Sequence, residues 1–211
     1  MRVTKAIKAE QLKLLQEHYF DAKPALEYTN EFELLVAVVL SAQCTDERVN
    51  IVTKRLFPEL NHPAKMLAIG VNKLETLIKD CGLYKSKAKN LIATCHILVE
   101  QYHGEVPREF DQLVELPGVG RKTANVVVSV LFGTPAIAVD THVFRVANRL
   151  KLGIAKTPEE MEQKLQKAIP KEKWSAAHHW LIYHGRRVCK ARKPLCETCF
   201  LNHLCPSAGK V

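Results

Sequence analysis

Apolar residues recur every three or four positions along most of the chain, as they do in amphipathic helices. In one stretch Phe32, Leu35 and Val39 share a helical face. Thr29 or Asn30 precedes them and can cap the helix. The pattern predicts helices over residues 10–19, 30–41, 46–56, 72–80, 86–102, 110–115, 122–131, 140–150, 158–169 and 175–189. Turns rich in Gly and Pro separate them, and no stretch alternates as a strand does, so we expect an all-α fold.

Composition narrows the class of protein. The chain has 211 residues, 47% hydrophobic and 25% charged, which excludes a disordered chain, a collagen-like repeat and a coiled-coil rod. Lys and Arg outnumber Asp and Glu by 31 to 22, which favours a polyanionic partner. No apolar run reaches the length of about 20 residues that spans a bilayer, and the start lacks a signal core. We expect a cytoplasmic protein, in which seven cysteines do not form disulfides.

A glycine-containing turn separates two of the predicted helices in residues 116–124. Gly118 and Gly120 permit positive φ and a close approach of the backbone to a ligand. The amides that begin the next helix favour an anion, so the turn can hold a phosphate. A Walker A loop is excluded because Arg121 stands where Gly is needed, and Thr123 excludes a dinucleotide fingerprint in the same way. A plain helix–turn–helix corner remains an equally good interpretation.

Two charged residues follow the turn. The positive end of its helix and neighbouring Arg121 would lower the pKa of Lys122, which frees an amine for nucleophilic attack. Asp140 follows an apolar run and precedes a helical pattern, as an N-cap does. When each residue is considered alone, a catalytic role is the weaker interpretation. Lys122 is then better explained as a solvated surface lysine, and Asp140 as a simple helix cap.

Four cysteines crowd the C-terminal part of the chain: Cys189, Cys196, Cys199 and Cys205. Zinc sites usually supply two short ligand pairs, and only Cys196 and Cys199 form one here. An iron–sulfur cluster tolerates uneven spacing and is favoured over zinc, and zinc over unliganded thiols.

Basic runs lie in two places. Residues 183–194 carry Arg186, Arg187, Lys190, Arg192 and Lys193 without an acid, partly inside the cysteine loop. Lys85, Lys87 and Lys89 form a second run. Such runs are usually solvated faces, but a loop shaped by a cluster can also bind phosphates.

Together these residues resemble the bacterial endonuclease III family of helix–hairpin–helix DNA glycosylases. The resemblance rests on the hairpin at 116–124, the aspartate segment 139–146, the cysteine spacing, and the segments 40–46 and 82–88. It implies two lobes: a six-helix barrel over residues 24–134, and an iron–sulfur lobe built from residues 1–23 and 135–211. It places Lys122 and Asp140 in an active site at the mouth between the lobes.

The resemblance also implies the chemistry. After the damaged nucleotide is flipped out of the duplex, Lys122 attacks C1′ and displaces the base while Asp140 stabilises positive charge and assists deprotonation. A Schiff base then permits β-elimination, which cleaves the strand. The residues implied to contact DNA are Gln43 and Leu83, which enter the base stack, and Gly118, Gly120, Arg121, Arg192 and Lys193. The four C-terminal cysteines would hold one [4Fe–4S] cluster, and hairpin carbonyls a monovalent cation.

The implied substrate is double-stranded DNA with damaged or abasic sites, in particular oxidised pyrimidines. We expect a monomer associated with the bacterial nucleoid. A mismatch-specific adenine glycosylase is the nearest alternative, but that family lacks lysine at the position of Lys122. A non-catalytic hairpin DNA-binding protein would have no need to combine Lys122 with Asp140. A small electron carrier is disfavoured by the basic composition and the long helical chain.

Overall fold

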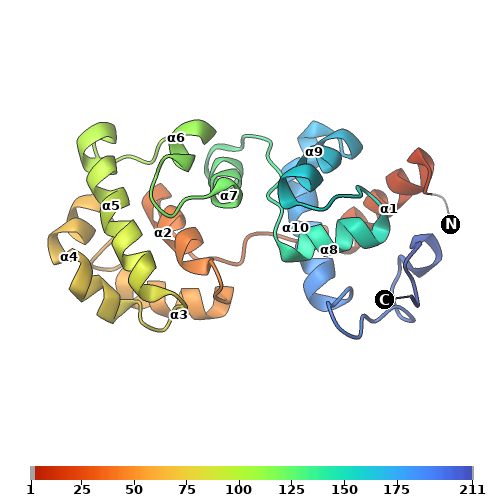
Figure 1. The fold of residues 1–211 in the computed structure, drawn as a ribbon, viewed down its shortest axis with the longest axis horizontal. Coiled ribbons are helices and arrows are strands. Elements are labelled where there is room, and N and C mark those ends of the chain that lie inside the picture. Colours follow the sequence, from red (N-terminus) through yellow and green to blue (C-terminus); the bar gives the residue numbers. More distant parts are fainter. Residues whose placement is uncertain (1–2, 211) are drawn as a thin grey trace. The chain divides into compact units, whose positions relative to one another are not determined.

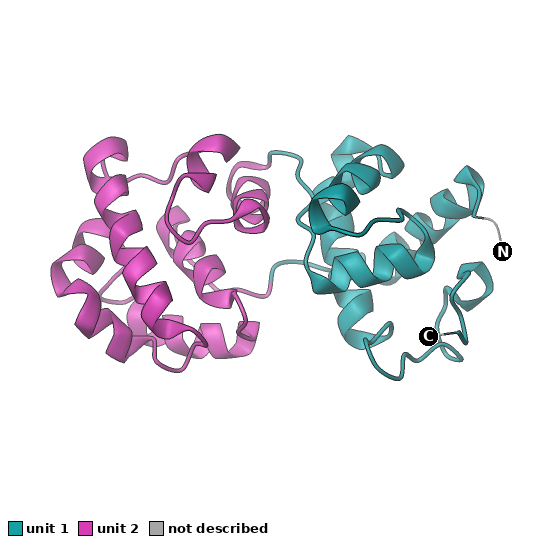
Figure 2. Cartoon of the chain, viewed as in Figure 1, with its two compact units in different colours: residues 1–24, 134–211 teal, residues 25–133 magenta. Residues whose placement is uncertain are grey.

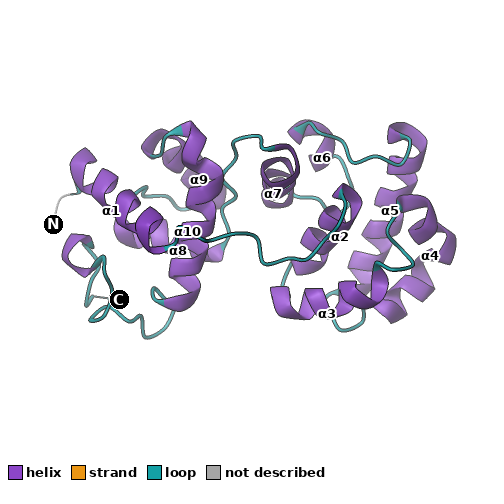
Figure 3. Cartoon of the chain, turned by 180° about the vertical axis from the view of Figure 1, so that it is seen from behind, coloured by secondary structure: helices purple, strands orange, loops and turns teal. Residues whose placement is uncertain are grey.

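The computed structural model describes residues 3–210, and in this range the regular elements are helices, with no strand (Figures 1 and 3). The all-α prediction is therefore confirmed. The α-helices are α1 (Lys5–His18), α2 (Glu31–Ser41), α3 (Asp46–Leu56), α4 (Pro63–Leu77), α5 (Tyr84–Tyr102), α6 (Phe110–Val114), α7 (Arg121–Phe132), α8 (Thr141–Leu150), α9 (Pro158–Ala168) and α10 (Trp174–Arg187). Two 3₁₀ turns, η1 (Lys171–Lys173) and η2 (Asn202–Leu204), complete them. Within this described range, no helix combines the length and apolar character needed to cross a bilayer.

The chain forms two compact units (Figure 2). Unit 1 consists of residues 1–24 and 134–211 and holds α1 together with α8, α9 and α10. Unit 2 consists of residues 25–133 and holds α2 to α7. Unit 1 is thus built from two segments that are distant in sequence.

Helix α2 forms the centre of unit 2. Every residue from Phe32 to Leu40 is buried, which is the mark of a helix surrounded by other elements. It packs against α3, α5 and α7. Its start is fixed by Asn30, whose Oδ1 accepts a hydrogen bond from the Glu33 amide at 2.9 Å. The Glu33 carboxylate in turn accepts from the backbone and hydroxyl of Thr29, so Asn30 is the cap and Thr29 supports the residue that Asn30 binds.

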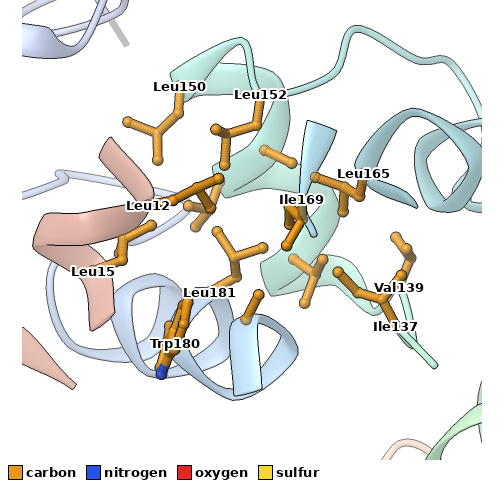
Figure 4. Close-up of a cluster of buried hydrophobic side chains, with 14 of the residues drawn as sticks. Leu12, Leu15, Ile137, Val139, Leu150, Leu152, Leu165, Ile169, Trp180 and Leu181 are labelled. Atoms are coloured by element: carbon orange, nitrogen blue, oxygen red, sulfur yellow. The ribbon is translucent and has the colours of Figure 1, made fainter. Parts of the chain in front are cut away.

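The core of unit 1 joins the N-terminal helix to the C-terminal part of the chain. Leu12 and Leu15 of α1 pack in one cluster with Trp180 and Leu181 of α10 (Figure 4). Gln11 adds a polar link, since its buried Nε2 donates to the carbonyl of Leu150 at 3.2 Å and to that of Leu204 at 2.9 Å. These contacts explain why α1 belongs to unit 1.

Helix α4 differs most from its prediction over 72–80, because it begins at Pro63. Proline suits the first helical position, where no amide partner is needed, and the His62 side chain caps this start. The turn-like sequence before it therefore opens a helix. Gly70 interrupts α4 with φ of 72°, which hides the helical period upstream of residue 72.

Candidate active site and nucleic-acid interface

The turn between α6 and α7 is held rigidly by α5. Gly118 has φ of 80°, and a Cβ atom there would lie 2.9 Å from Asn90 Nδ2. Only glycine fits this position without strain. The Thr94 hydroxyl donates to the Pro117 carbonyl at 3.0 Å. Residues of α5 therefore fix the hairpin that precedes α7.

Helix α7 begins without a side-chain cap. Gly120 occupies the N-cap position with extended backbone and has no side chain that could cap the helix. Lys122 lies in this first turn and is exposed. The Arg121 guanidinium lies over the Phe110 ring, 5.0 Å from its centroid. The start of a helix that has no side-chain cap, together with two cations, is suited to a phosphate group.

Asp140 stands at the start of α8, as the sequence pattern predicts. Its Oδ1 accepts a hydrogen bond from the Val143 amide at 2.8 Å, so it caps the helix. The preceding residues 136–139 are buried, and the Ala138 carbonyl accepts a hydrogen bond from His178 Nδ1 at 2.7 Å. Asp140 itself is only partly buried. One carboxylate oxygen thus orients the side chain and leaves the other for a ligand.

The same helix holds the cysteine loop at its other end. Arg145 donates to the carbonyls of Cys189 at 3.0 Å and Gly185 at 2.9 Å. Arg149 donates to the Lys190 carbonyl at 2.7 Å and approaches Cys189 Sγ at 3.4 Å. A Cβ atom on Gly185 would lie 2.9 Å from the His142 side chain, so α8 and α10 are closely packed. Helix α8 therefore links the position of Asp140 to the cysteine loop.

The four C-terminal cysteines line one hollow in unit 1, together with apolar residues such as Leu150, Val188 and Leu195. In residues 3–210 no three His, Cys, Asp or Glu side chains meet closely enough to hold a single metal ion. Thiols spread around a hollow suit a cluster, in which each thiolate binds a different iron. Burial raises the pKa of the Cys199 and Cys205 thiols, and bound iron would reverse this effect by favouring thiolate. The residues present therefore fit an iron–sulfur cluster.

A hydrogen-bond chain supports one of these cysteines. Burial raises the pKa of Tyr19 to about 12 and lowers that of His184 to about 4, so both are neutral near pH 7. The Tyr19 hydroxyl lies 3.1 Å from His184 Nδ1. A thiolate at Cys199 can only accept a hydrogen bond, so with the cluster bound the imidazole proton belongs on Nε2 and Nδ1 accepts from Tyr19. Nε2 lies 3.7 Å from Cys199 Sγ. The imidazole N–H can therefore donate to the thiolate of Cys199.

Gln43 and Leu83 lie on two neighbouring loops of unit 2. Both residues have left-handed backbone, with φ of 53° and 59°. A Cβ atom on Gly82 would lie 3.0 Å from the Gln43 carbonyl oxygen, so the two loops touch. Leu83 precedes the first residue of α5 and is 58% exposed. Left-handed backbone at two adjacent non-glycine positions is a feature of functional sites.

The second basic run is interpreted from its sequence as a solvated face, and for Lys87 this interpretation is wrong because the residue is buried. Only 5% of this residue is exposed, and its Nζ donates to the carbonyls of Leu40 at 2.8 Å and Ala42 at 2.6 Å. Burial lowers the pKa of its ammonium group. The sequence offers one indication that Lys87 is buried. Lys87 lies four residues before apolar Leu91, so the two side chains share one face of the helix. Lys87 joins the end of α2, next to Gln43, to the start of α5.

Arg192 and Lys193 are exposed in the loop between the first two cysteines of the set. Lys193 has φ of 51°, and the loop is closed by a hydrogen bond from the Leu195 amide to the Val188 carbonyl at 3.0 Å. The structure thus gathers the predicted residues into groups within each unit. Unit 2 holds the hairpin group and the pair of Gln43 and Leu83. Unit 1 holds Asp140 and the cysteine loop with its two cations.

Comparison with protein families matches residues 36–171 to the HhH-GPD superfamily of base excision DNA repair proteins. Residues 189–205 match the iron–sulfur binding domain of endonuclease III. Endonuclease III of Escherichia coli strain K12 is 51% identical to this chain over 99% of both proteins. The chain belongs to the endonuclease III family. Endonuclease III of Bacillus subtilis is 53% identical, over 90% of this chain and 87% of the relative.

Solved structures agree with this assignment. A trapped covalent intermediate of an endonuclease III with DNA matches with a TM-score of 0.95 and 50% identity, over 98% of each chain. A thermostable thymine-DNA glycosylase matches with a TM-score of 0.87 at 22% identity, so its fold is similar to that of this chain. This endonuclease III family member is a DNA glycosylase and abasic-site lyase of base excision repair. It carries a [4Fe–4S] cluster.

Proposed function

We propose that the protein excises oxidised pyrimidines from double-stranded DNA with Lys122 as the nucleophile, and then cleaves the strand 3′ to the abasic site. One observation carries the proposal: the exposed Lys122 amine lies in the first turn of α7, directly after the glycine hairpin. The chain is also 50% identical to an endonuclease III that was trapped in a covalent complex with DNA.

Access to the sugar requires the damaged nucleotide to leave the duplex, because C1′ and the base are shielded inside the stack. Leu83 is exposed and apolar, and is suited to fill the gap as a wedge. Gln43, on the adjoining loop, carries an amide that can pair with the orphaned base. The open amides near Gly118 and Gly120, with Arg121, grip a phosphate of the same strand.

The reaction then uses two side chains. The neutral Lys122 amine forms a bond to C1′, and the bond from C1′ to the base breaks with its electron pair leaving on the base. Asp140 stabilises positive charge that develops on the sugar and assists removal of the proton from the attacking amine. The nitrogen lone pair then opens the sugar ring: the C1′–O4′ bond breaks, O4′ takes up a proton, and a protonated Schiff base remains. This Schiff base acidifies the C2′ hydrogens. Loss of one of them breaks the bond from C3′ to oxygen, and water later releases the lysine.

The remaining parts hold the DNA in place. Cys189, Cys196, Cys199 and Cys205 would bind the cluster, whose function here is to fix the shape of the basic loop. From this loop Arg192 and Lys193 contact phosphates near the lesion. Free lone pairs of the hairpin carbonyls bind a monovalent cation. The protein acts as a monomer of two lobes, a six-helix barrel and an iron–sulfur lobe, and works on DNA of the nucleoid.

Borohydride trapping tests the nucleophile. Duplexes with thymine glycol, with an abasic site, or without damage are incubated with the holoprotein and borohydride, which reduces a Schiff base to a stable amine. We expect a covalent adduct with the first two duplexes and none with the third. Lys122→Ala should bind the damaged duplex and give no adduct, whereas Lys73→Ala, which removes another exposed lysine of unit 2, should react normally.

The outcomes separate the alternatives. Absence of an adduct from the wild-type protein on both damaged duplexes would refute the assignment of Lys122. Base release from an adenine mismatch without strand cleavage would instead identify a monofunctional adenine glycosylase. Binding with no base release on any duplex would leave only a DNA-binding protein.

A further inference from the structure

Unit 1 contains a large open hollow that is separate from the cysteine loop. Its volume is about 920 Å³, within the range of cavities that bind small molecules. One wall is α1, a second is the segment 151–154, and a third is the C-terminal part of α9 with residues 169–173. None of the residues proposed for base excision lines it.

The rim of this hollow is strongly basic. Seven lysines line it, and none of the lining residues is acidic. Lys8 and Lys173 are held by Leu152 and Gln16, through hydrogen bonds of 2.8 and 3.0 Å to a carbonyl and an amide oxygen. Both of these partners are neutral, so the two ammonium charges remain uncompensated.

Most of the other lysines of the rim also lack a counter-charge. Lys13 lies 3.9 Å from one carboxylate on each side along α1, at the limit of an ion pair. Lys5, Lys151, Lys164 and Lys167 pair with no carboxylate of residues 3–210. Like charges around one hollow repel one another, and a bound polyanion would relieve that repulsion.

The floor of the hollow is apolar. Leu12, Leu152, Ile169 and Trp180 line it and belong to the core of unit 1. Ile154 stands at the edge with 67% of its surface exposed. A nucleic-acid backbone needs only a basic face, whereas a basic rim above an apolar floor suits a small anion that also carries a flat, weakly polar ring.

We propose that this hollow binds a nucleoside polyphosphate, with the phosphates among the lysines and the base against the apolar floor. The size of the hollow accommodates such a ligand, and the arrangement of charge and apolar surface matches its two ends. Binding here is independent of the excision chemistry, because no residue of the hollow belongs to the proposed active site.

Isothermal titration calorimetry on the holoprotein tests the proposal. The ligands are ATP, inorganic tripolyphosphate and adenosine at low ionic strength. We expect ATP to bind at least tenfold more tightly than tripolyphosphate, and adenosine not to bind detectably. The double variant Lys164→Glu and Lys167→Glu should weaken ATP binding at least tenfold. The control, Lys156→Glu with Lys73→Glu, makes the same change in net charge on exposed lysines outside the hollow and should change binding less than twofold.

Strand cleavage of an abasic duplex distinguishes this site from the active site. The double variant of the hollow should cleave within twofold of the wild-type rate. A parallel loss of cleavage and of undamaged-duplex binding would identify the hollow as a DNA-contact surface and overturn the proposal. Equal affinity for tripolyphosphate and ATP, or equal weakening by both double variants, would also overturn it.

Discussion

Replacing Lys87 with Met removes the link between the two loops that carry Gln43 and Leu83. Methionine keeps an unbranched chain of similar length but cannot donate a hydrogen bond. The Lys87 ammonium donates at 2.8 Å to Leu40 and at 2.6 Å to Ala42, both at the C-terminal end of α2. A cation at this end also interacts favourably with the helix dipole.

The size of the effect follows from these two bonds. A hydrogen bond to a charged group contributes about 1.5–3 kcal/mol, so losing two removes about 3–6 kcal/mol. Burial of the ammonium opposes this, as its lowered pKa shows, and we expect a net loss of about 2–4 kcal/mol. For a chain of this size the melting temperature should fall by about 4–16 °C.

The assay pairs stability with activity. Urea unfolding and strand cleavage are measured for Lys87→Met and for Lys89→Met, which removes an exposed lysine from the same helix. Only Lys87→Met should be less stable, and its KM for damaged duplex should rise more than kcat falls. Combined with Gln43→Ala, it should lose less activity than the two single changes predict, because both act through one loop.

Two results would refute this reasoning. If Lys87→Met is as stable as Lys89→Met, the two carbonyl bonds do not stabilise the loops. If stability falls while KM stays unchanged, Lys87 supports the fold without positioning the residues that enter the DNA.

Three further changes test other parts of the site. Asp140→Asn keeps a capping oxygen and should leave stability within about 0.5 kcal/mol of wild type while strand cleavage slows about a hundredfold or more, whereas Asp140→Ala should also lose about 1 kcal/mol of stability in urea unfolding. Gly118→Ala should destabilise by about 1–3 kcal/mol because φ is 80° and Asn90 lies 2.9 Å from the new carbon. Gly120→Ala has open space around it and should lose only about 0.5 kcal/mol, because alanine is a poorer N-cap residue than glycine. Burial lowers the pKa of His179 below 6.5, so the unfolded chain binds a proton first and stability should fall as pH drops below 6.5. His179→Gln should reduce this slope in thermal melts from pH 7.5 to 5, and the part that remains should come from His184, whose pKa is also lowered by burial.

The sequence was most informative where function depends on local geometry. Capping by Asn30 and Asp140 follows from short-range hydrogen bonds, and both residues cap the helices expected of them. The hairpin glycines and the cysteine spacing are equally local. The hydrogen bonds of Lys87 span more than 40 residues, and the contact of Tyr19 with His184 spans 165. The hydrophobic pattern of a single helix cannot predict such contacts, because they form only when segments distant in sequence pack together.

Helix α8 explains how the cluster can matter to excision, a reaction that involves no electron transfer. Its first residue follows Asp140, and its last turns hold the cysteine loop through Arg145 and Arg149. Among their acceptors are the main-chain carbonyls of Cys189, Lys190 and Ala191, whose positions depend on the shape of that loop. The loop is mostly exposed and polar, so it lacks a core that would hold this shape without bound metal. Losing the cluster would therefore loosen the support of α8 and, with it, the orientation of the Asp140 carboxylate. Glycosylase activity should then depend on the presence of the cluster and be insensitive to its oxidation state.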